Sequence, residues 1–316
     1  MRYAQTFGLG EHTEVLTLGE GGTPLLRAEG FGHEIFLKLE SRNPSGSFKD
    51  RASALLLAEM KARRIESAVE DSSGNAGASF AAYAARAGIE AKVFSPESAA
   101  GPKLEQIEAY GAELNRVPGP RSASAEAVLQ AVEGGAAYAS HAYLPFGLPG
   151  LATIAYEIYE QLGQAPGSVI APVGHGSLLL GIAMGFEALK TAGKIERVPH
   201  MVAVQASACA PLWVVASMGP SGLGMVTEGE TLAEGVRVRT PLRGDALLQR
   251  LQPGQGQIRI VEEEAILPGR NALAQMGFYV EATSAIVWDA LRQVAGEIPE
   301  PIALILSGSG LKTFNA

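Results

Sequence analysis

Short strand-like runs alternate with longer helix-like stretches along most of this chain, and this alternation most constrains its fold. The runs 67–71, 91–95 and 168–173 have the length and composition of buried strands. Stretches rich in alanine and leucine separate such runs, for example 51–64 and 178–190. Parallel strands need a crossover connection, so this spacing indicates βαβ units. The pattern therefore predicts an α/β protein with parallel sheets.

The length of 316 residues allows two domains or one large α/β domain. A loop at 141–150 holds two prolines and two glycines and resembles a crossover between two sets of βα units. We expect a smaller sheet domain at 41–143, inserted into a larger domain of 1–40 and 144–316. The stretches 206–224 and 252–257 are glycine-rich and are expected to be irregular.

Composition and charge exclude several classes of protein. The formal net charge is −8 and no block of Lys or Arg occurs, which argues against nucleic acid or an anionic membrane as a partner. The longest apolar run, 178–186, is too short to span a bilayer. The start of the chain, 1–6, lacks the apolar segment of a secretory signal. We therefore expect a cytoplasmic protein with no membrane or nucleic-acid partner.

One turn carries a lysine in an unusual position. The strand-like run 34–40 leads into a turn of small residues at 41–48, and a helix-like run follows directly. Lys49 stands where the turn meets the helix, so it can be half buried among backbone N–H groups. A lysine in such a place is a candidate for Schiff-base chemistry with a carbonyl compound. The alternative is an ordinary solvated lysine at the start of a helix.

Three other turns follow predicted strands, at the edge where ligands bind in parallel sheets. The run Gly174, His175, Gly176, Ser177 and Leu178 opens a helix, and its glycines let backbone N–H groups approach an anion. Its alternative is a plain tight turn. The second turn holds Ser72, Ser73 and Asn75, which suit a carboxylate and an aromatic oxygen, or simply cap a helix. In the third, the hydroxyl of Ser307 suits a hydrogen bond with a ring nitrogen, or the residue simply lies in a flexible glycine turn.

Other kinds of catalytic centre are not favoured. The five histidines show neither HxxxH nor HExxH spacing, so we expect no metal site. The nucleophile elbow G-x-S-x-G is absent as well. Cys209, the single cysteine, stands among small residues and is expected to be a buried thiol rather than a nucleophile.

The lysine turn, the Ser-Gly-Asn turn, the glycine turn and the terminal serine, in this order, resemble the pyridoxal-phosphate enzymes of fold type II. This superfamily includes the tryptophan synthase β-subunit, cysteine synthase, threonine dehydratase and threonine synthase. The segments 18–25 and 37–51 look like the corresponding segments of threonine synthases. The segment 72–79 fits as well, and 153–158 and 281–285 are similar to later parts of the family. The resemblance covers nearly the whole chain.

The resemblance implies a tryptophan synthase β-subunit-like fold of two three-layer domains with parallel sheets, a homodimer, and pyridoxal 5'-phosphate as cofactor. Lys49 would bind the cofactor covalently and later act as the base at the α-carbon of an amino-acid substrate. Asn75 would bond the ring hydroxyl, and Ser307 would face the pyridine nitrogen. The phosphate would lie on Gly174, His175, Gly176, Ser177 and Leu178. The substrate carboxylate would lie on Ser72, Ser73 and Asn75.

The activity implied is that of a lyase most like threonine synthase, which converts O-phosphohomoserine to threonine. The stretch 141–150 departs from that pattern, because threonine synthases usually carry basic residues there and this stretch has no Arg or Lys. A second departure is His175, where the family commonly has Asn or Gly. The alternatives are a serine/threonine dehydratase and a cysteine-synthase-like β-replacement enzyme. A non-catalytic binding protein is a further alternative, against which the retained Lys49 argues.

Overall fold

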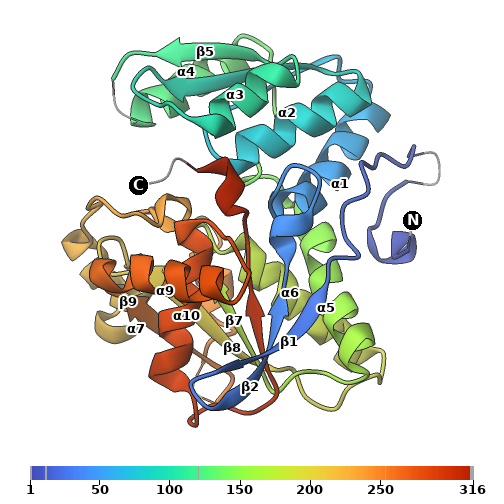
Figure 1. Ribbon diagram of the computed structural model, residues 1–316. Coiled ribbons are helices and arrows are strands. Elements are labelled where there is room, and N and C mark those ends of the chain that lie inside the picture. Colours follow the sequence, from blue (N-terminus) through green and yellow to red (C-terminus); the bar gives the residue numbers. More distant parts are fainter. Residues whose placement is uncertain (1, 11–12, 120, 253, 314–316) are drawn as a thin grey trace. The chain divides into compact units, whose positions relative to one another are not determined.

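The structure is a computed structural model that describes residues 2–10, 13–119, 121–252 and 254–313 (Figure 1). The chain forms two compact units. Unit 1 comprises Met1–Gly21, Asn43–Gly150 and Lys312–Ala316, and unit 2 comprises Gly22–Arg42 and Leu151–Leu311. Unit 1 contains the stretch 41–143 expected as the smaller domain, apart from residues 41 and 42. It also includes 1–21, 144–150 and 312–316, which were expected in the larger domain.

Unit 1 is built on a four-stranded sheet of order β5-β4-β3-β6, in which all pairs are parallel. The strands are β3 (Ser67–Glu70), β4 (Glu90–Pro96), β5 (Glu113–Val117) and β6 (Ala137–Tyr138). The helices are α1 (Lys49–Ala62), α2 (Asn75–Ala87), α3 (Pro102–Ala109) and α4 (Arg121–Glu133), with 3-10 turns η1 (Ala4–Thr6) and η3 (Pro145–Gly147). The parallel pairing confirms the predicted βαβ units.

The core of unit 1 forms because its central helix is made almost entirely of small and aromatic residues. In α2, Phe80 and Tyr83 are fully buried between alanines, and they pack with Leu57, Val93 and Ile107. The helix ends at Gly88, whose φ of 73° is the left-handed conformation that glycine adopts without strain. This packing fixes the start of α2 against α1.

Unit 2 is built on a six-stranded sheet of order β1-β2-β10-β7-β8-β9. The strands are β1 (Leu25–Gly30), β2 (His33–Lys38), β7 (Ser168–Pro172), β8 (His200–Ala206), β9 (Gly256–Val261) and β10 (Ile302–Ile305). All pairs are parallel except β1 with β2. Phe31 and Gly32 join these two strands with φ values of 54° and 79°, and a two-residue turn with positive φ favours an antiparallel hairpin.

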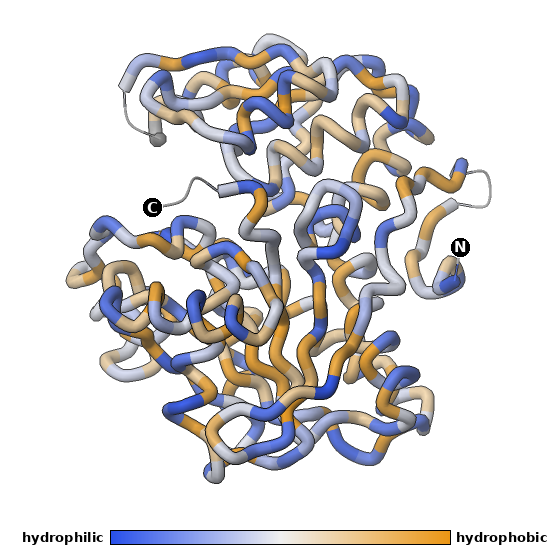
Figure 2. The backbone as a smooth tube through the Cα atoms, viewed as in Figure 1, coloured by the Kyte–Doolittle hydropathy of each residue, from blue (hydrophilic) through white to orange (hydrophobic). Residues whose placement is uncertain are grey.

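Helices and apolar strands together form the core of unit 2. The α-helices are α5 (Leu148–Leu162), α6 (Ser177–Thr191), α7 (Pro211–Met218), α8 (Gly244–Leu248), α9 (Glu263–Gln275) and α10 (Ala282–Val294). The 3-10 turns are η2 (Glu40–Arg42), η4 (Pro220–Met225), η5 (Glu234–Val236) and η6 (Gly310–Lys312). Figure 2 shows hydrophobic residues along the sheet strands, and β7 and β10 are buried over their whole length. Among the described residues, no helix is long and apolar enough to cross a membrane.

Candidate functional site

In unit 1 the lysine turn is closed by the residue that follows the lysine. The carboxylate of Asp50 accepts hydrogen bonds from the backbone N–H of Ser45 (2.6 Å) and from its hydroxyl (2.5 Å). Asp50 is fully buried, and this burial raises the pKa of its carboxyl group while the bonds from Ser45 oppose the rise. Lys49 is the half-buried first residue of α1, with Nζ 5.0 Å from the centre of the Phe48 ring. The turn therefore presents one lysine from a fixed backbone.

The Ser-Gly-Asn turn lies beside the lysine turn in the same unit. Asn75 begins α2 just as Lys49 begins α1. One turn further along each helix, the hydroxyl of Ser79 donates to that of Ser53 at 2.8 Å. The structure thus brings Lys49 and Asn75 to neighbouring helix starts, where backbone N–H groups point outward and favour an anion.

Glycine is required close to this turn because two backbone segments nearly touch. A Cβ atom at Gly77 would lie 1.8 Å from the carbonyl oxygen of Ser72. Ser72 is buried and its Oγ accepts a bond from the N–H of Gly74 at 3.3 Å, while Ser73 is half-buried. The predicted carboxylate-binding residues therefore form one tight loop that leads into α2.

In unit 2 the predicted glycine turn joins β7 to α6. Gly176 precedes the first helical residue with a φ of 95°. A Cβ atom at Gly174 would lie 2.8 Å from the carbonyl oxygen of Gly235, so the turn needs glycine there. The N–H of Arg243 donates to the carbonyl of His175 at 2.9 Å and fixes the outer side of the turn. Ser177 and the buried Leu178 begin α6, whose free N–H groups suit a phosphate.

Ser307 lies beside this glycine turn in unit 2. It follows β10, which pairs in parallel with β7 in a register that sets Leu304 opposite Ile170. The next residues of both strands therefore end at the same edge of the sheet. The hydroxyls of Ser307 and Ser177 are both buried, and neither has a hydrogen-bond partner among the described residues. Two such hydroxyls next to a glycine turn at a helix start fit a phosphorylated ring with a nitrogen atom.

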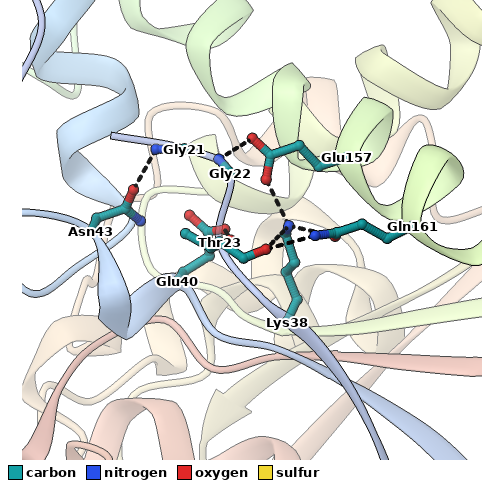
Figure 3. Close-up of polar contacts among 8 residues, drawn as sticks. All are labelled: Gly21, Gly22, Thr23, Lys38, Glu40, Asn43, Glu157 and Gln161. Carbon is teal, nitrogen blue, oxygen red and sulfur yellow. Dashed lines mark hydrogen bonds and ion pairs between the residues drawn. The ribbon is translucent and has the colours of Figure 1, made fainter. Parts of the chain in front are cut away.

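Sequence reasoning missed the long-range partners of two buried carboxylates, Glu70 and Glu157. In unit 1, Nδ1 of His141 lies 2.7 Å from Oε1 of Glu70. In unit 2, Nζ of Lys38 lies 2.6 Å from Oε2 of Glu157 (Figure 3). The partners of each pair are 71 and 119 positions apart, so no local pattern could have indicated them. No group of three or more potential metal ligands occurs in the described parts of the chain.

A family model for pyridoxal-phosphate dependent enzymes matches residues 16–308. The chain belongs to this family. Curated relatives of this pyridoxal-phosphate dependent enzyme include the threonine synthase of Methanocaldococcus jannaschii, 32% identical over 100% of this chain and 81% of the relative. The threonine synthase of Synechocystis sp. is also 32% identical, over 98% of this chain and 82% of the relative.

Solved structures agree with the family. A threonine deaminase from T.th. has a TM-score of 0.77 and 27% identity, over 93% of this chain and 94% of that chain. Maize serine racemase has a TM-score of 0.77 at 20% identity, over 91% of this chain and 88% of that chain, and supports the fold alone. The predicted fold type II, the pyridoxal phosphate cofactor and the lyase class are confirmed for this pyridoxal-phosphate dependent enzyme.

Proposed function

We propose that this pyridoxal-phosphate dependent lyase breaks a carbon–oxygen bond of an amino-acid substrate, in a reaction most like that of threonine synthases. The first candidate reaction converts O-phosphohomoserine to threonine. The observation that carries the proposal is the lysine turn, in which buried Asp50 holds the turn that presents Lys49. The similarity to threonine synthases over the whole chain supports it.

In this proposal Lys49 would hold the cofactor, and its amine would be the base that takes the proton from the substrate α-carbon. The cofactor supplies an electron sink for the charge left on that carbon. Ser72, Ser73 and Asn75 bind the substrate carboxylate together with backbone N–H groups at the start of α2. The amide of Asn75 also donates to the ring hydroxyl of the cofactor.

The residues of unit 2 bind the other groups of the cofactor in this proposal. The N–H groups of Gly174, His175, Gly176, Ser177 and Leu178 hold its phosphate. Ser307 bonds its ring nitrogen with a hydroxyl, which leaves that nitrogen less positive than a carboxylate partner would. A weaker electron sink favours elimination and replacement over transamination.

A second candidate reaction has its own structural support. Among the described residues, those that line a small cavity inside unit 1 include no arginine or lysine, and the ionisable groups on its wall are those of Glu70 and His141. A phosphorylated substrate would be expected to meet basic residues. The cavity therefore favours dehydration of serine or threonine, or a β-replacement on a related amino acid.

We also propose a homodimer that acts in the cytoplasm. The resemblance to fold type II enzymes supports the dimer. Independently of the dimer, the acidic net charge of −8 suits a protein without nucleic-acid partners. Sedimentation equilibrium of the purified protein tests the dimer. A mass of one chain across micromolar concentrations would contradict it.

The experiment that tests the proposed function compares Lys49→Ala with a matched lysine variant. The purified protein should show an absorbance band at about 410–420 nm, and Lys49→Ala or borohydride treatment should remove it. Lys61→Ala is the control, because Lys61 lies near the other end of α1 and pairs with exposed Glu14. Assays with O-phosphohomoserine, L-threonine and O-acetylserine then rank the candidate reactions. A colourless protein that takes up no pyridoxal phosphate would overturn the proposal.

A further inference from the structure

A small cavity inside unit 1 lies next to the residues proposed for catalysis. Ala52, one turn after Lys49 in α1, and Ala76, directly after Asn75 in α2, form part of its wall. Ser53 and Phe80 add to the wall from the same two helices. The cavity therefore lies at the helix starts that carry the proposed base and the proposed carboxylate-binding loop. Such a cavity has room for a group of about the size of a hydroxyl or a water molecule.

The ends of two paired strands bring an ionisable pair to this cavity. In the parallel register, Val69 of β3 lies opposite Tyr138 of β6. Glu70, at the end of β3, and His141, just beyond β6, thus meet on the cavity wall. The Glu70 side chain is 1% exposed and that of His141 is 16% exposed.

The hydrogen bond between them fixes the orientation of the imidazole. Nδ1 of His141 lies 2.7 Å from Oε1 of Glu70. An ionised carboxylate can only accept, so the tautomer that fits this contact carries its proton on Nδ1. A carboxylate in this position holds the ring in one plane and compensates the charge of an imidazolium. The other ring nitrogen, Nε2, is then the atom through which His141 would act on a substrate.

The charges on the cavity wall select between leaving groups. When the imidazole of His141 carries a proton, its charge and that of Glu70 cancel, and the described residues of the wall include no arginine or lysine to balance a phosphate dianion. A phosphate group would also lie near the buried carboxylate of Glu70, which repels it. A hydroxyl group brings no charge into the cavity, but it is a poor leaving group unless its oxygen receives a proton.

We propose that His141 is a catalytic residue that protonates the departing hydroxyl oxygen of a β-hydroxy amino acid, and that Glu70 positions it. Lys49 takes the α-proton, and the electron pair of that C–H bond forms the α,β double bond. The Cβ–O bond breaks, its electron pair stays on the oxygen, and the oxygen takes the Nε2 proton and leaves as water. His141 then regains a proton from solvent. This inference rests on the lyase function proposed above and selects dehydration among its candidate reactions.

The experiment compares leaving groups in the holoenzyme. L-Serine and L-threonine lose a hydroxyl that needs a proton, whereas β-chloro-L-alanine loses chloride, which needs none. His141→Gln should lower kcat about 10²–10⁴-fold on the hydroxyl substrates and less than about tenfold on β-chloro-L-alanine. Glu70→Gln should also lower kcat on the hydroxyl substrates relative to kcat on β-chloro-L-alanine, but by a smaller factor. Tyr143→Phe, at an exposed tyrosine two positions away, is the control and should leave both rates unchanged.

Two further readouts separate this inference from the proposed function. Exchange of the substrate α-proton in deuterated water and the visible absorbance of the cofactor should persist in His141→Gln, because both depend on Lys49. Equal losses of kcat on hydroxyl and chloride substrates, or wild-type turnover restricted to phosphorylated substrates, would overturn the role of His141. A wild-type protein that neither exchanges the α-proton nor eliminates from any amino acid would instead overturn the proposed function itself.

Discussion

Replacement of Lys38 by methionine should destabilise unit 2 because it leaves a buried carboxylate without its cation. The Nζ of Lys38 is fully buried and donates to the Thr23 carbonyl (2.8 Å), to Glu157 Oε2 (2.6 Å) and to Gln161 Oε1 (2.9 Å). Figure 3 shows Thr23 and the side chains of Glu157 and Gln161, both from α5, converging on the ammonium group of Lys38 at the end of β2. Three bonds use all three ammonium protons.

The size of the effect follows from what remains after the change. In Lys38→Met, Thr23 still accepts from Gln161 Nε2 at 2.9 Å, and Glu157 still accepts from the N–H of Gly22 at 2.8 Å. The carboxylate of Glu157 stays buried without its cation, which costs about 3–5 kcal/mol of unfolding free energy. In the double variant Lys38→Met/Glu157→Met both charges of the pair are gone, while the buried carboxylate of Glu40 keeps its bond from Thr23 Oγ1 at 2.7 Å. The chief loss is then the Gly22 bond, about 0.5–1.5 kcal/mol. The two changes should therefore couple by at least about 2 kcal/mol.

Cys209 gives the assay for this prediction. It is the single cysteine, it is 1% exposed, and it lies in unit 2 with the ion pair. Labelling of its thiol in a urea series reports opening of unit 2 without requiring that both units unfold together. A double variant as unstable as Lys38→Met alone would refute the reasoning, because the cost would then come from lost packing rather than from an unpaired charge. The cofactor absorbance should persist in Lys38→Met, unlike in Lys49→Ala.

Three smaller predictions concern single groups. Burial, with a contribution from Arg259, lowers the pKa of His200 below 6.5. The stability that neutral His200 contributes is therefore complete above pH 6.5 and is lost as the pH falls through the folded-state pKa. The urea midpoint of His200→Gln should depend less on pH below 6.5 than that of the wild type. Burial raises the pKa of the Cys209 thiol, so iodoacetamide should alkylate it about 10²-fold or more slowly in native protein than in urea, and equal rates would contradict its burial. The amide in Asp50→Asn offers one acceptor oxygen for the two bonds from Ser45. This variant should therefore lose about 1–3 kcal/mol of unfolding free energy in urea, which is more than Ser45→Ala should lose.

The parts of the fold that the sequence predicted are those with local causes. The buried strands β7 and β8 are continuous apolar runs, and glycines such as Gly88 end helices by their own conformation. The edge strand β9 lies partly in a stretch expected to be irregular, because glutamine and arginine alternate with isoleucine there and weaken the apolar signal. The antiparallel β1–β2 pair was also missed, since its turn contains Phe31, which is uncommon at positive φ.

The candidate site divides in the same way between local and distant causes. Lys49, Asn75 and Ser307 are visible in the sequence because each stands at a strand-to-turn junction whose small residues are close together along the chain. The pairing of Glu70 with His141 depends on the register of β3 with β6, which no local pattern encodes.

The absence of basic residues at 141–150 is therefore informative only together with the structure. In the sequence it removes one means of binding phosphate and leaves the substrate open. In the structure, the first residue of that stretch is bonded to a buried carboxylate on the wall of a cavity beside the proposed base. A histidine held in this way can supply a proton, which a hydroxyl leaving group requires and a phosphate group requires far less. A hydroxyl leaving group thus explains the lack of basic residues at 141–150 better than a weakened site for a phosphate leaving group does.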